Sequence, residues 1–134
     1  MKANELRIGN FISYRDEKIL KVSSIGDCGL RTCNVNGITS GSDCIDDYQP
    51  IPLTPEILVL NSFGEDNNGH FLLDLQTDYL EIIPMKDGFY PMYGQKRETS
   101  GDSDNLVTLN RIDSVHQLQN LYFALTGEEL NIDL

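Results

Sequence analysis

The sequence predicts an α+β fold, and three observations support this class. Short segments rich in β-branched and aromatic residues alternate with tight turns over residues 5–50. A second group of such segments lies within residues 70–112. An amphipathic helix with clear end signals covers residues 114–127. Because 134 residues suit one hydrophobic core, we expect a single domain over residues 1–134.

The N-terminal region is expected to form a small, curved antiparallel sheet or barrel. Its predicted strands are 8–14, 19–25 and 30–35, followed by a return strand at 38–40 and a short strand at 44–45. Asn36-Gly37 is the strongest short hairpin signal in the chain. Several short strands with tight turns in about 45 residues favour strong curvature.

A short helix is predicted next, over residues 54–64. Pro50 and Pro52 end the preceding strands, because neither residue suits a central strand. Thr54 can cap the helix and Pro55 suits its first position. Gly64 is the expected left-handed residue at its end.

Residues 70–112 are expected to form further antiparallel strands. A hairpin is predicted from the segments 70–75 and 79–83, with additional strands at 89–93 and 106–109. Residues 94–105 contain almost no apolar side chain, which predicts a mobile surface loop.

The last helix has the clearest signals. Ser114 and Gln117 have the spacing of a capping box, and Gly127 follows the helical pattern as a terminator. Apolar residues recur along it at helical spacing, so we expect this helix to pack on a sheet face.

The charge is strongly negative and unevenly distributed. The net charge is −11, and residues 32–85 contain no Lys or Arg but nine acidic residues. Such a chain would repel nucleic acid and anionic membranes, so we expect neither as a partner. The acidic middle is typical of a solubilising surface. Its alternative use is docking on a basic protein or mimicking nucleic acid.

No motif for catalysis, a cofactor or a metal is present. There is no Walker loop, dinucleotide fingerprint or nucleophile elbow. Cys28, Cys33 and Cys44 lack the spacing and the fourth ligand of a zinc site, so we expect free thiols. The chain is therefore predicted not to be an enzyme and to bind no cofactor.

Two groups of residues are candidates for partner binding. Asp43, Asp46 and Asp47 form an acidic cluster. Tyr90, Met92 and Tyr93 surround Pro91 in an aromatic and methionine-rich segment, and these residue types are enriched in protein interfaces. We expect an unidentified protein partner of basic character, and this composition is also compatible with a homo-oligomer.

The apolar segments are too short to cross a membrane. The start of the chain has no apolar stretch of the kind found in signal peptides. We therefore expect a cytoplasmic protein.

Three segments carry a family resemblance. They are Leu6–Asn10, Gln49–Glu56 leading into Phe63-Gly64, and the long ending Val115–Leu130, which reads VHQLQNLYFALTGEEL. Together they resemble small uncharacterised proteins of Bacteroides-type gut bacteria and their phages and prophages. The resemblance implies a phage or mobile-element origin and a bacterial cytoplasm, but names no catalytic residue. The N-terminal pattern is also similar to SH3-like barrels, which is an analogy of fold alone.

These observations favour a non-enzymatic protein-interaction accessory module of phage or mobile-element origin. One alternative is an acidic inhibitor of a host defence system that mimics nucleic acid. The other is an enzyme whose site has no recognisable motif.

Overall fold

A computed structural model of the chain describes residues 1–15, 18–26, 29–33, 45–95 and 105–134. These residues form two compact units. The first combines Met1–Pro52 with Ser114–Leu130, and the second combines Leu53–Asp113 with Asn131–Leu134. Each unit contains one antiparallel sheet, so the predicted α+β class is confirmed. The single domain over 1–134 stays a prediction.

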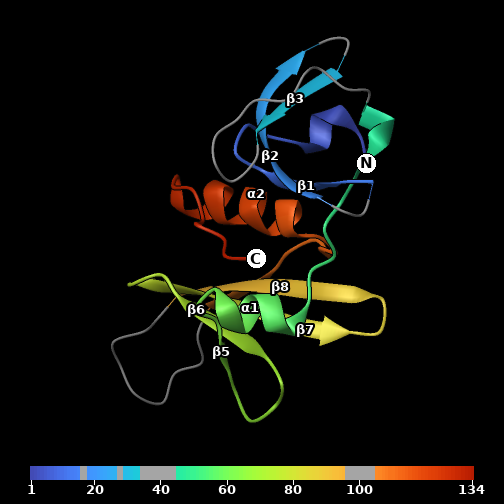
Figure 1. Cartoon of the computed structure of the whole chain (residues 1–134). Helices are drawn as coiled ribbons and strands as arrows, with labels where there is room; N and C mark the ends of the chain where they lie inside the picture. Colours follow the sequence, from blue (N-terminus) through green and yellow to red (C-terminus); the bar gives the residue numbers. More distant parts are fainter. Residues whose placement is uncertain (16–17, 27–28, 34–44, 96–104) are drawn as a thin grey trace. The chain divides into compact units, whose positions relative to one another are not determined.

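The first unit contains a curved four-stranded sheet with the order β3-β2-β1-β4, drawn mainly in blue in Figure 1. A register shift between Val22 and Ser24 interrupts the β2–β3 pairing, and such irregularities increase local twist. Within the described ranges the strands do not close into a barrel. The elements are η1 (Ala3–Glu5), β1 (Phe11–Tyr14), β2 (Lys18–Gly26), β3 (Gly29–Cys33), η2 (Ile45–Asp47) and β4 (Tyr48–Gln49).

The first three predicted strands are confirmed, although the first begins only at Phe11, and residues 34–35 of the third lie outside the described residues. The expected strand at 44–45 is wrong at Ile45, which begins the 3-10 turn η2. Asp46 and Asp47 complete this turn, and Asp is disfavoured in strands. The predicted hairpin at Asn36-Gly37 and the return strand at 38–40 lie outside the described residues.

The core of the first unit comes from alternating positions of its strands. Ile12, Val22 and Leu30 project from three neighbouring strands, and each has at most 1% of its surface exposed. Leu6 and Tyr48 complete this buried cluster. Burial of each such aliphatic side chain contributes about 1.5–3 kcal/mol, so the cluster is a main favourable contribution to the stability of this small sheet.

Helix α2 (Val115–Thr126) completes the first unit and lies against β1. Its predicted ends are confirmed: the capping box of Ser114 and Gln117 is present, and Gly127 has a left-handed φ of 73°. The contact of α2 with β1 also confirms the expectation that this helix packs on a sheet.

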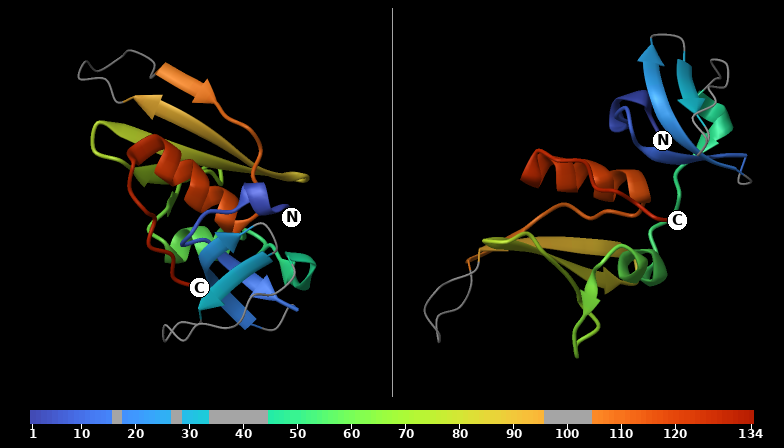
Figure 2. Two further views of the ribbon diagram at one scale, coloured as in Figure 1. Left: turned by 90° about the horizontal axis from the view of Figure 1, so that it is seen from above. Right: turned by 60° about the vertical axis from the view of Figure 1, so that its left-hand side comes forward.

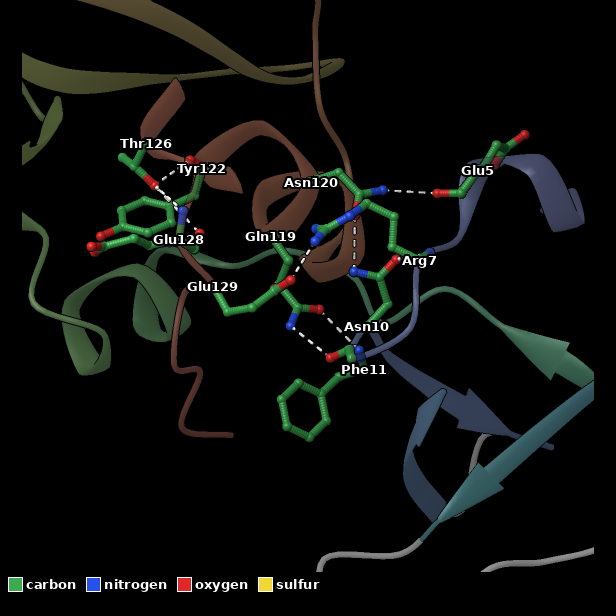
Figure 3. A network of polar contacts seen from close by, with 11 residues as sticks. Glu5, Arg7, Asn10, Phe11, Gln119, Asn120, Tyr122, Thr126, Glu128 and Glu129 are labelled. Atoms are coloured by element: carbon green, nitrogen blue, oxygen red, sulfur yellow. Dashed lines mark hydrogen bonds and ion pairs between the residues drawn. The ribbon is translucent and has the colours of Figure 1, made fainter. Parts of the chain in front are cut away.

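Polar contacts link α2 to the chain preceding β1 (Figure 3). The side chain of Gln119 accepts a hydrogen bond from the Phe11 amide (2.9 Å) and donates one to the Gly9 carbonyl (3.1 Å). Asn120 accepts from the Asn10 side chain (2.9 Å) and donates to the Glu5 carbonyl (2.8 Å). Three of these bonds give a side-chain partner to a backbone group, namely the Phe11 amide and the Gly9 and Glu5 carbonyls.

The second unit contains a five-stranded sheet with the order β5-β6-β7-β8-β9, and β9 lies beside β8 in Figure 2. The predicted hairpin and both later strands are confirmed. Of the predicted loop 94–105, residues 96–104 lie outside the described residues. Its first two residues belong to β8, and its last residue belongs to β9. The elements are α1 (Pro55–Leu60), β5 (Gly64–Glu65), β6 (Phe71–Asp74), β7 (Asp78–Met85), β8 (Gly88–Gln95) and β9 (Asn105–Thr108).

The two faces of this sheet differ. Phe71, Ile82 and Pro91 occupy paired positions on one face and are buried, and we call this the inner face. Glu81 and Met92 are paired on the opposite, outer face and are half-buried. The difference follows from the alternation of side chains along each strand.

Helix α1 ends earlier than predicted. It stops at Leu60, so the range 54–64 is too long and Gly64 is not its cap. Instead, the Asn61 side chain donates to the Ile57 carbonyl (2.8 Å), and Ser62 adopts a left-handed φ of 74°. Gly64 is a strand residue of β5. Asn can satisfy the end of a helix where glycine is the commoner choice.

Candidate functional site

One candidate site is an apolar groove on the second unit, between α1 and the strands β5, β6 and β7. It has a volume of about 640 Å³. We call it the α1 groove. Its lining residues are Pro55, Glu56, Val59 and Leu60 of α1, Glu65 of β5, Gly69 of the following turn, Phe71 of β6 and Pro84 of β7.

The sequence explains why one wall of the groove is a helix with exposed apolar residues. The Thr54 hydroxyl oxygen accepts a hydrogen bond from the Ile57 amide (3.2 Å), and this cap fixes the start of α1. Leu58 is fully buried, whereas 53% of Val59 and 58% of Leu60 are exposed. A six-residue helix cannot bury four consecutive apolar residues on one face. Val59 and Leu60 therefore remain on the groove side.

The other wall is the sheet. Phe71 is buried at the base of the groove, and Pro84 lies two residues beyond Ile82 on the same inner face. Gly69 has a left-handed φ of 76° in the turn before β6. The Pro84 ring and the packed Phe71 ring keep this wall preformed, as is typical of binding sites.

Carboxylates give the groove a negative potential. Glu56 and Glu65 lie at its margin and are exposed. Among the described residues that line it, none is basic. The sequence reinforces this asymmetry, since residues 32–85 contain no Lys or Arg. The site therefore combines an apolar surface with an acidic margin, which complements an apolar segment flanked by cations.

The aromatic residues predicted for partner binding are divided between the two faces of the sheet. Tyr90 and Met92 lie on the outer face, whereas Tyr93 lies on the inner face, because neighbouring strand residues alternate. None of the three lines the α1 groove as described. The Tyr90 hydroxyl donates to Asp87 (2.6 Å), and the Tyr93 hydroxyl donates to Asp78.

Both tyrosines remain neutral phenols in this setting. The hydrogen bond to the Asp87 carboxylate raises the pKa of Tyr90, and the bond to Asp78 raises that of Tyr93. A nearby carboxylate disfavours a phenolate for electrostatic reasons. The two side chains can therefore serve in recognition but not as anionic nucleophiles.

The predicted acidic cluster belongs to the first unit. Asp46 is exposed in η2, and Asp47 forms an ion pair with Arg15 (3.7 Å). Asp43 lies outside the described residues. Of the cysteines, Cys33 is a free, half-buried thiol, and Cys28 and Cys44 also lie outside the described residues.

The two histidines occupy different environments. His116 is buried in the first turn of α2, where burial lowers its pKa, and the Glu5 carboxylate offsets only part of this effect. Within the described part of the chain, its Nε2 atom has no hydrogen-bond partner. His70 is half-buried in the second unit, with its Nδ1 atom 2.8 Å from an Oε1 atom of Glu81.

Sequence reasoning missed the α1 groove, although a signal was present. Residues 57–60 are all apolar, and a helix that short leaves some of them exposed. The pairing of His70 with Glu81 had no comparable signal, because it depends on the register of β6 and β7.

No helix within the described ranges is long and apolar enough to span a membrane. Comparison of the chain with family models, curated proteins and solved structures finds no match to any of them.

Proposed function

We propose that the chain is a non-enzymatic protein-binding module that takes an apolar segment of its partner into the α1 groove. The observation that carries this proposal is the exposure of Val59 and Leu60 beside a preformed apolar wall. Contiguous exposed apolar surface of this kind usually marks an interaction site.

The charge of the groove indicates the chemistry of the partner. Glu56 and Glu65 favour Lys or Arg on either side of the apolar segment. This agrees with the expectation of a basic partner from the net charge of −11. Apolar contacts would supply most of the affinity, because exposed ion pairs contribute only about 0–1 kcal/mol each.

The alternatives receive less support. Mimicry of nucleic acid would require the carboxylates of the acidic middle to share one surface, but Asp78 and Glu81 lie on opposite faces of the sheet. An enzyme would require a pocket that gathers reactive groups, but the described lining of the α1 groove contains neither histidine nor cysteine.

The biological setting is proposed from the sequence resemblance. It favours an accessory protein of a phage or mobile element that acts in the cytoplasm of a bacterial host. A partner protein with an accessible segment of apolar and basic residues would then come from the host or from the element itself.

Selection of displayed random peptides on the purified protein tests the proposal. We expect enriched peptides that combine a large apolar residue with flanking Lys or Arg. Leu60→Ser should weaken binding of such a peptide about 10-fold or more, since a buried leucine contributes about 1.5–3 kcal/mol. Glu65→Gln should weaken it by a factor of about 2–5.

Leu106→Ser is the matched control, because Leu106 is an exposed leucine on β9 outside the groove. It should leave peptide affinity unchanged. Equal binding by the wild type and Leu60→Ser would refute the proposal. Self-association that Leu60→Ser abolishes, with no peptide enriched, would instead identify a second copy of the chain as the occupant and would also overturn it.

A further inference from the structure

We propose that Asp66, His70 and Glu81 form a binding site for a divalent transition-metal ion on the second unit. One ligand atom from each of these residues lies within 4.8 Å of the other two. His70 lies on the outer face with Glu81, whereas the α1 groove is built on the inner face. The site is therefore separate from the proposed peptide-binding groove.

Backbone amides hold the Asp66 carboxylate in place. Asp66 begins the turn between β5 and β6, and its Oδ1 atom accepts hydrogen bonds from the amides of Asn68 (2.8 Å) and His70 (2.9 Å). These bonds orient the carboxylate and leave its Oδ2 atom facing the His70 ring at 4.0 Å. In known metal sites, hydrogen bonds from groups that do not bind the metal orient the ligands in the same way.

The third ligand comes from the neighbouring strand. Leu72 of β6 pairs with Glu81 of β7, so His70, directly before β6, is diagonal to Glu81. This diagonal places Nδ1 of His70 2.8 Å from Oε1 of Glu81. Both side chains are partly exposed, at 29% and 16%, so an ion from solution can reach them.

The distances match a common ion. Two ligand atoms that each lie about 2.1 Å from one metal ion are at most about 4.2 Å apart. The His70–Glu81 and His70–Asp66 separations of 2.8 and 4.0 Å already satisfy this limit. The two carboxylate ligand atoms lie within 4.8 Å of each other, so at most a small side-chain rotation brings them within the limit.

The donor set selects the class of metal. One imidazole nitrogen and two carboxylate oxygens suit borderline ions such as Zn²⁺, Mn²⁺ or Co²⁺ better than Mg²⁺, which prefers oxygen alone. Three protein ligands leave positions open for water or for a group of a partner.

The electrostatic environment also favours a cation. Hydrogen bonds from the backbone amides of His70 and Asn68 lower the pKa of Asp66, so this carboxylate is ionised at neutral pH. No Lys or Arg occurs in the sequence between residues 32 and 85 to compete for the two carboxylates. A metal ion at Nδ1 of His70 would bind between the ring and the two carboxylates.

Titration calorimetry of the full chain with Zn²⁺ tests the site. Asp66→Asn keeps an oxygen for the turn amides, and Glu81→Gln keeps an acceptor for the His70 ring, so both variants should fold. Each variant should lower the Zn²⁺ affinity of this site at least about 10-fold. Replacing even a group that only supports the metal ligands lowers affinity by about this factor or more.

Asp74→Asn is a matched control. Asp74 lies in the same hairpin, and its Oδ1 atom likewise accepts a backbone hydrogen bond, from Gln76 (2.8 Å). The Asp74→Asn variant should bind Zn²⁺ with the same affinity as the wild type. A parallel experiment follows the backbone amide signals by NMR during addition of Co²⁺, which should broaden the signals of residues around 66, 70 and 81 first.

Three outcomes would overturn the inference. They are the absence of any Zn²⁺ binding, equal affinity of wild type and Asp66→Asn, and broadening that centres on the cysteines. None of these results affects the α1 groove, since its test uses peptides and no metal.

Discussion

Replacing Gln119 tests how the last helix holds the first unit together. This side chain is 2% exposed and binds two backbone groups at once, the Phe11 amide and the Gly9 carbonyl. Gln119→Ala removes both bonds and leaves the two backbone groups near the start of β1 without a side-chain partner. Gln119→Glu keeps the acceptor for Phe11 but loses the donor for Gly9 when ionised.

The expected magnitude follows from these two bonds. Each hydrogen bond contributes about 1 kcal/mol net, and a buried group left unsatisfied costs about 1–3 kcal/mol. We therefore expect Gln119→Ala to lower the free energy of unfolding by about 2–4 kcal/mol. Gln119→Glu should cost at least as much at pH 7, because it also buries a charge.

Urea unfolding followed by far-ultraviolet circular dichroism measures the change. Ala124→Ser, an exposed change on the same helix, should stay within about 0.5 kcal/mol of the wild type. The deficit of Gln119→Glu should shrink toward about pH 4, since a protonated carboxyl can both accept and donate. A Gln119→Ala variant as stable as the Ala124→Ser control would show that the helix is not anchored through this residue.

Two further changes test local features of each unit. Burial lowers the pKa of His116 in the folded state, so the unfolded chain takes up a proton first as pH falls below about 6.5. Wild-type stability should therefore decrease between pH 7.5 and 5.5 more than that of His116→Gln, and parallel profiles in urea would contradict this. In the second unit, Thr54→Ala should cost about 1 kcal/mol, because it removes the cap on the Ile57 amide, and Thr54→Ser should restore most of it. Equal unfolding midpoints for Thr54→Ala and Thr54→Ser would refute the role of the cap.

The elements that the sequence predicted best are those specified by local chemistry. The capping box at Ser114, the glycine at 127 and the apolar spacing between them agree on one helix. The hairpin of β6 and β7 was predictable for the same reason, since alternation and a polar turn identify it without knowledge of the rest of the chain.

Features that depend on distant residues could not be predicted. The end of α1 at Asn61 is one example, because the Asn61 side chain also exchanges hydrogen bonds with the backbone of Asp133 (2.7 and 2.9 Å). This contact makes asparagine a suitable cap and leaves Gly64 free to pair in β5. The separation of Tyr93 from Tyr90 and Met92 depends on strand alternation, which a cluster of similar residue types does not reveal.

The order of the two units along the chain has a consequence for biosynthesis. The first unit begins at Met1 but is completed only by Ser114–Leu130, after the segment 53–113 has been made. The Val115 amide then donates to the Ile51 carbonyl (2.9 Å), which joins the start of α2 to the N-terminal part of the first unit. During translation about 60 residues are therefore synthesised between the N-terminal sheet and helix α2, which completes the same unit. At about 5–20 residues per second this delay lasts several seconds, during which β1 lacks its contact with α2.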